Sequence, residues 1–66
     1  MKKILLNGES HETAAETIAD LVASLGFPAP TLLIEHNGDA LRRAEWPSRE
    51  VADGDRVELL RIAAGG

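Results

Sequence analysis

The sequence of 66 residues contains no cysteine. The chain therefore forms no disulfide, offers no thiolate to a metal ion and has no cysteine nucleophile. A small domain without such covalent staples depends on well-matched side-chain packing for its stability. The absence of cysteine also fits a reducing compartment.

Long apolar runs are scarce as well. No stretch approaches the roughly 20 apolar residues that span a bilayer. The N-terminal segment 1–7 has two lysines but only three apolar residues after them, whereas a signal peptide needs an apolar stretch of about 7–15 residues. We therefore expect no membrane association and a cytoplasmic protein.

Positive charge is in the minority, because 11 acidic residues face 7 lysines and arginines and the formal net charge is −4. Binding of nucleic acid requires a concentrated positive surface, so nucleic acid is not an expected partner. An acidic domain is better suited to dock on a basic protein surface. A domain of this length buries only about 60% of its unfolded surface, and so thin a core argues against an enzyme with a deep catalytic cleft.

One amphipathic helix is predicted in the first half of the chain. Its apolar residues recur at the spacing of a single helical face, namely Ile18, Leu21, Val22 and Leu25. Gly26 suits the left-handed position that ends a helix. The start is open between two capping pairs, Thr13 with Glu16 and Thr17 with Asp20.

Five strands are predicted from apolar runs between turn residues, over residues 3–7, 9–13, 31–36, 40–43 and 56–62. Asn7-Gly8 and Asn37-Gly38 predict tight turns, because both residue types tolerate positive φ. Trp46 is expected to cover one end of the core. The order of elements is that of a β-grasp, an α+β fold with a mixed sheet of four to five strands and one helix packed across one face. Its first and last strands should lie side by side at the centre.

Three motifs, in this order, resemble the ThiS family of ubiquitin-like sulfur carriers. They are Asn37-Gly38-Asp39 followed by Arg43 and Trp46, then Asp53-Gly54-Asp55, and finally Gly65-Gly66. The resemblance covers nearly the whole chain. Two positions depart from it, since Arg42 stands where the family often has proline and Ala63-Ala64 precede the terminal pair.

The resemblance implies a division into a β-grasp domain, residues 1–62, and a flexible tail, residues 63–66, whose working residues are Ala64, Gly65 and Gly66. A ThiF-like adenylating enzyme would join the Gly66 carboxylate to AMP from ATP. A sulfur donor would then displace AMP, and the resulting thiocarboxylate would serve a ThiG-like thiazole synthase. ATP and magnesium would belong to the partner enzyme. This chain would hold no cofactor or metal and supply no catalytic residue.

Docking on the partner is predicted to involve Leu60, Arg61 and Arg43. Leu59 and Leu60 are consecutive strand residues and should point to opposite faces, so that one of them is solvent-facing and available as an anchor.

Three alternative functions remain open. A MoaD-type carrier for molybdopterin synthesis shares the fold and the tail. A non-catalytic β-grasp interaction module would use its sheet and never its terminus. A ubiquitin-like modifier would form isopeptide bonds to lysines instead of a thiocarboxylate.

Overall fold

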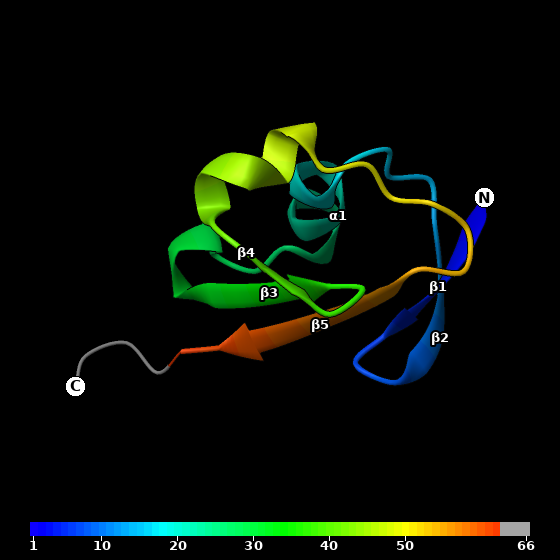
Figure 1. Ribbon diagram of the computed structural model, residues 1–66, viewed down its shortest axis with the longest axis horizontal. Coiled ribbons are helices and arrows are strands. Elements are labelled where there is room, and N and C mark those ends of the chain that lie inside the picture. Colours follow the sequence, from blue (N-terminus) through cyan, green and yellow to red (C-terminus); the bar gives the residue numbers. More distant parts are fainter. Residues whose placement is uncertain (63–66) are drawn as a thin grey trace.

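The computed structural model describes residues 1–62, which form a five-stranded mixed sheet with one α-helix against one face (Figure 1). The elements in chain order are β1 (Lys2–Leu6), β2 (Glu9–Thr13), α1 (Ile18–Leu25), the 3₁₀ helix η1 (Ala29–Thr31), β3 (Leu32–His36), β4 (Asp39–Leu41), the 3₁₀ helix η2 (Arg43–Ser48) and β5 (Arg56–Arg61). The strand order is β2-β1-β5-β3-β4, with β5 parallel to β1 and antiparallel to β3. The predicted β-grasp fold, with the first and last strands adjacent, is confirmed.

Two Asn-Gly turns close the hairpins and also fasten the central strand β5. Asn7 and Asn37 have φ of 51° and 52°, the left-handed conformation that such turns require. The backbone N–H of Leu59 donates to Asn7 Oδ1 at 2.7 Å, and that of Arg56 donates to Asn37 Oδ1 at 2.8 Å. Each turn thus supplies a side-chain acceptor to a different part of β5.

The helix α1 begins at the second of the two capping pairs. Thr17 Oγ1 accepts the backbone N–H of Asp20 at 3.1 Å, which satisfies one of the free donors of the first turn. Thr13 instead ends β2, where its hydroxyl accepts the N–H of Ala15 at 3.0 Å. Gly26, with φ of 78°, ends the helix as predicted. Within residues 1–62 no helix is long and apolar enough to cross a membrane.

The core lies between α1 and the sheet and includes Ile4, Ile18, Leu21, Leu32, Ile34, Val51 and Val57. Trp46 is buried at 3% exposure, as predicted.

The sequence analysis was wrong about the segment that carries this tryptophan. The predicted strand over residues 40–43 is shorter, Asp39–Leu41, and the chain then turns into η2. Pro47 has no ladder donor, and Glu45 Oε1 accepts the N–H of Arg42 at 2.7 Å. Both features favour a capped helical turn over a longer strand.

Candidate functional site

The sheet face opposite α1 carries exposed apolar side chains. Leu5 of β1, Leu33 of β3 and Leu60 of β5 are 42%, 52% and 63% exposed. Leu33 and Leu60 are direct partners in the β3–β5 register, so their side chains lie next to each other. Leu59 points the other way and packs against the core. The structure therefore places the predicted anchor Leu60 on the surface.

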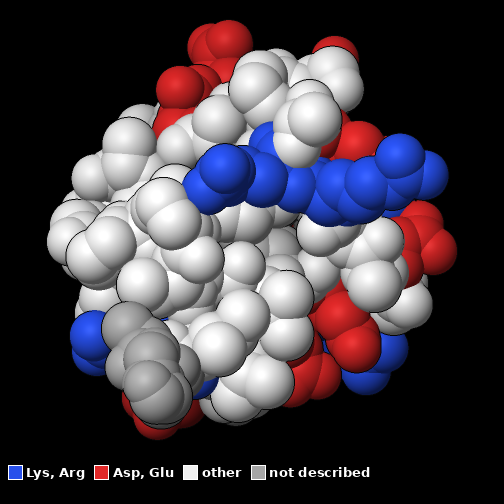
Figure 2. Space-filling view, turned by 90° about the vertical axis from the view of Figure 1, so that its left-hand side faces the viewer, with Lys and Arg blue, Asp and Glu red and all other residues white. Residues whose placement is uncertain are grey.

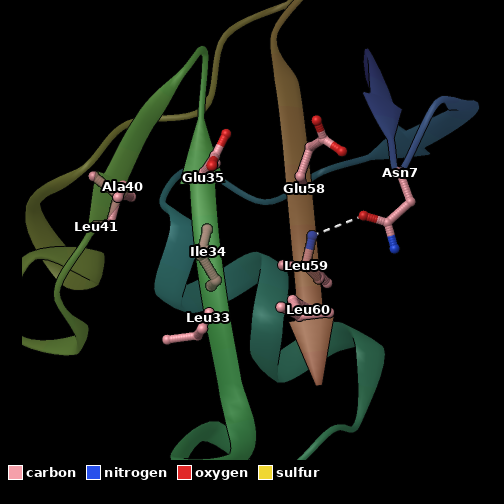
Figure 3. A pocket seen from close by; sticks show the side chains of 9 residues that line it. All are labelled: Asn7, Leu33, Ile34, Glu35, Ala40, Leu41, Glu58, Leu59 and Leu60. Atoms are coloured by element: carbon pink, nitrogen blue, oxygen red, sulfur yellow. Dashed lines mark hydrogen bonds between the residues drawn. The ribbon is translucent and has the colours of Figure 1, made fainter. Parts of the chain in front are cut away.

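An open groove of about 510 Å³ runs over β3, β4 and β5 on this face. Figure 3 shows its side chains, with α1 behind the sheet. Leu33 and Leu60 line one end together, and Glu35 and Glu58 line the other. The groove therefore combines an apolar part with an acidic part.

The other two predicted docking residues do not share this face. Arg61 follows Leu60 in the same strand and points to the opposite side, where its guanidinium carbon lies 5.0 Å from the centre of the Phe27 ring. Arg43 is exposed at the start of η2. Figure 2 views the molecule from the left-hand side of Figure 1. It shows basic side chains in a row above a largely uncharged surface. A role of Arg61 and Arg43 in docking stays a prediction.

The residues predicted to carry the chemistry, Ala64, Gly65 and Gly66, lie outside the described residues. The last described residue is Ile62, whose N–H donates to Thr31 O at 2.7 Å. Its side chain is 48% exposed. The register of β5 on β3 thus continues to the point where the described chain ends, beside the exposed Leu60.

A polar cluster that the sequence analysis missed surrounds His36, whose exposed fraction is 5%. Asp55 Oδ2 lies 2.7 Å from His36 Nε2, and Arg49 Nε donates to His36 Nδ1 at 2.9 Å. Because an arginine Nε is always a donor, Nδ1 is the acceptor in this contact, and Nε2 is the ring nitrogen that donates to Asp55. Arg49 also forms an ion pair with Asp39, at 2.6 Å.

Asp55 is the acceptor at the centre of this cluster. Burial alone would raise the pKa of its carboxyl. Hydrogen bonds from the Asn37 side chain, the backbone N–H of Ala52 and His36 outweigh burial and hold that pKa below its ordinary value. The carboxylate therefore stays ionised and joins the β3–β4 turn to the start of β5.

The His36–Asp55 pair resembles part of a catalytic triad, but both ring nitrogens of His36 are occupied within the fold. It is therefore a structural link and not a base that is free to take a proton from a substrate. Among residues 1–62, no group of three or more histidine, cysteine, aspartate or glutamate side chains is placed to hold a metal ion. The one sequence signal for this cluster is a histidine at an inward position of the otherwise apolar strand β3.

Comparison with known proteins points to one family. The sequence model of the ThiS family matches residues 4–66. The sulfur carrier protein ThiS of Thermus thermophilus is 29% identical over 63 residues, which cover 96% of this chain and 98% of that protein. The crystal structure of the thiamine biosynthesis protein (ThiS) from Geobacter metallireducens has a TM-score of 0.80 and 31% identity, and the alignment covers 97% of this chain and 99% of that chain.

Larger proteins also contain a similar segment. The thiazole synthase of Paramagnetospirillum magneticum is 28% identical over 65 residues, and that of Magnetococcus marinus is 31% identical over 65 residues. Each alignment covers 97% of this chain but 20% of the synthase. The chain thus spans about a fifth of the length of these two relatives.

Proposed function

The chain belongs to the ThiS family, and from this premise we propose that it is a sulfur carrier for formation of the thiazole of thiamin, with Gly66 as the residue that carries the sulfur. The observation on which this rests most is the family match, because it extends through the terminal Gly65-Gly66. In this role the chain is a co-substrate of other enzymes and not a catalyst.

The proposed chemistry follows from the low reactivity of a carboxylate. An oxygen of the Gly66 carboxylate attacks the α-phosphorus of ATP and releases pyrophosphate, which leaves an acyl adenylate. Sulfide-level sulfur (HS⁻) then attacks the activated carbonyl carbon, AMP departs with one of the former carboxylate oxygens, and loss of the S–H proton leaves a thiocarboxylate. Glycine suits both steps, because a residue without Cβ allows close approach to the attacked carbonyl.

The proposed partners are a ThiF-like adenylating enzyme and a ThiG-like thiazole synthase. ATP and Mg²⁺ would be bound by the adenylating enzyme, where the metal neutralises phosphate charge. The synthase is supported by the two larger relatives, in which a segment similar to this chain is part of a protein named thiazole synthase. In such a protein the carrier segment and the synthase that accepts its sulfur would be parts of one chain. No separate binding step between two proteins would then be needed.

Docking on the adenylating enzyme is proposed to use the open sheet face beside the end of β5. An exposed leucine in a partly apolar groove is a suitable anchor, because burial of such a side chain contributes to association without a cost to the free fold. Leu60 would be that anchor, with Leu33 next to it. Arg61 and Arg43 do not lie on this face and would make further contacts with the partner outside it.

The test is the intact mass of the chain after incubation with a ThiF-like adenylating enzyme, ATP, Mg²⁺ and a sulfur donor. The expected gain is about 16 Da, from exchange of one oxygen for sulfur. The matched control lacks Gly66 and should keep its fold but gain no mass. An unmodified wild-type chain, with an enzyme proven active on another carrier, would contradict the proposal.

A further inference from the structure

Two glutamates face each other across the open side of the sheet. Glu35 of β3 and Glu58 of β5 are direct partners in the antiparallel register, and both are exposed. Figure 3 shows their side chains at the same level of the two strands. Directly opposed residues have Cβ atoms only about 4.5–5.5 Å apart, and like charges at such a pair destabilise a sheet. The free chain thus carries an unfavourable contact at the acidic end of its groove.

The fold does not compensate this charge pair within the described chain. In residues 1–62 the two ion pairs are His36–Asp55 and Arg49–Asp39, and neither involves Glu35 or Glu58. Arg56 shares the open face with Glu58, two residues away, but it does not come within the 4.0 Å of an ion pair.

Other acidic residues do have structural partners. Asp53 accepts the N–H of Lys3, Asp55 binds His36, and Glu45 caps η2. Glu35 and Glu58 make no such contact, and they differ from the other acidic residues without one in that they face each other in the sheet register.

The apolar part of the groove lies next to the two glutamates on the same strands. Leu33 and Leu60 form the register pair two residues from Glu35 and Glu58 on the same face. A partner that covers the leucines must therefore also cover the two carboxylates. Otherwise it removes part of the hydration of these carboxylates at the edge of the interface. Burial of two unpaired carboxylates is strongly unfavourable.

We propose that Glu35 and Glu58 together receive one arginine or lysine of the adenylating enzyme, while an apolar side chain of that enzyme packs between Leu33 and Leu60. One cation between the two carboxylates removes their mutual repulsion and forms charge-assisted hydrogen bonds to both. A partner without a basic group at this position is rejected by the same pair. The inference rests on the proposed function and adds to it the chemical identity of the docking contact.

The test measures the dissociation constant of the adenylating enzyme used in the mass assay, by calorimetry at low ionic strength. The variants are Glu35→Gln, Glu58→Gln and the double substitution. Glu12→Gln is the matched control, because Glu12 is an exposed strand residue on the outer strand β2. Each single variant should weaken binding about ten-fold, as expected for loss of one close charge contact. The double variant should bind more weakly than either single one, because the cation of the partner then has no carboxylate, and the control should bind like the wild type.

The melting temperature of each variant shows whether weaker binding is caused by loss of folding. Replacement of either glutamate removes the repulsion, so the melting temperature of each variant should equal or exceed that of the wild type. A variant with a lower melting temperature and weaker binding would overturn the inference, because the glutamates would then support the fold instead of the docking contact.

The outcomes separate the inference from the function on which it rests. Unchanged binding of the glutamine variants, with a wild type that gains sulfur, overturns the inference alone. Weakened binding of the variants, with a wild type that gains no sulfur, supports the inference and contradicts the proposed function. A wild type that does not bind contradicts both. A wild-type dimer that dissociates on substitution of either glutamate would assign the surface to a second copy of this chain and overturn the inference.

Discussion

Arg49 donates its Nε–H to Nδ1 of His36 at 2.9 Å, and this contact satisfies one ring nitrogen of a histidine that is 5% exposed. The same imidazole reaches Asp55 through Nε2. The three side chains join β3, the segment after η2 and the residue before β5. They therefore help to fix where the central strand begins, and with it the position of the groove.

Removal of the arginine should leave a buried acceptor without a donor. We expect Arg49→Met to lower the free energy of unfolding by about 1–3 kcal/mol, the usual cost of an unsatisfied buried polar group. Urea unfolding followed by circular dichroism measures this change. Arg43→Met is the control, and as a substitution of an exposed residue it should change stability by no more than about 0.5 kcal/mol. Equal stabilities of the two variants would show that the contact with His36 contributes nothing.

Acid should weaken the fold through Asp55. Its pKa is lower in the folded chain than the ordinary value of 3.8, so the unfolded chain takes up the proton first as the pH falls. The stabilisation is complete above the ordinary pKa and is lost as the pH falls below it towards the folded pKa. Unfolding measured from about pH 6 to about pH 2 should therefore show a steeper loss of stability for the wild type than for Asp55→Asn. Parallel profiles of the two proteins would contradict the role assigned to Asp55.

The Asn7 side chain should matter through its acceptor as well as its turn conformation. Asn7→Ala removes the partner of the Leu59 N–H and a residue type that tolerates positive φ. We expect a loss of about 1–3 kcal/mol in the free energy of unfolding. Asn7→Asp keeps the acceptor and should recover most of that loss. If aspartate is as destabilising as alanine, the hydrogen bond to β5 is not the reason.

Replacement of Leu60 should weaken binding of the adenylating enzyme and leave the stability of the fold almost unchanged. Because its side chain is 63% exposed, Leu60→Ala should change the free energy of unfolding by no more than about 0.5 kcal/mol. Its dissociation constant for the adenylating enzyme should rise about ten-fold or more, as for an apolar anchor. Leu5→Ala, on β1 of the same sheet, is the control and should bind almost normally. Equal binding by the wild type and both variants would place the docking surface elsewhere.

The elements with local sequence signals were predicted well. The helix carries its apolar spacing and Gly26, and each hairpin carries an Asn-Gly turn, so each signal lies within a few residues. The choice between Thr13 and Thr17 as the helix cap needed the structure, because Thr13 with Glu16 fits the capping-box pattern better, whereas the helix is capped by Thr17. The helical turn η2 was missed because Pro47 excludes a regular strand without indicating what replaces it.

Contacts between distant segments could not be predicted from the sequence. His36 and Asp55 are 19 residues apart, and no spacing rule connects them. Glu35 and Glu58 face each other only in the observed register of β3 with β5, and a shift of one strand by one residue would have moved its glutamate to the core side. The role of the terminal Gly65-Gly66, in contrast, was predicted from three motifs taken together, and it stays a prediction.

The central claim is that sulfur is carried on the carbonyl carbon of Gly66. The most direct measurement is the mass of the C-terminal peptide after activation with an isotopically labelled sulfur donor, followed by fragmentation to locate the label. The account predicts labelled sulfur at Gly66, which disappears on incubation with thiazole synthase and its substrates but persists with molybdopterin synthase. A label on any other residue, or its transfer to the molybdopterin enzyme instead, would contradict it.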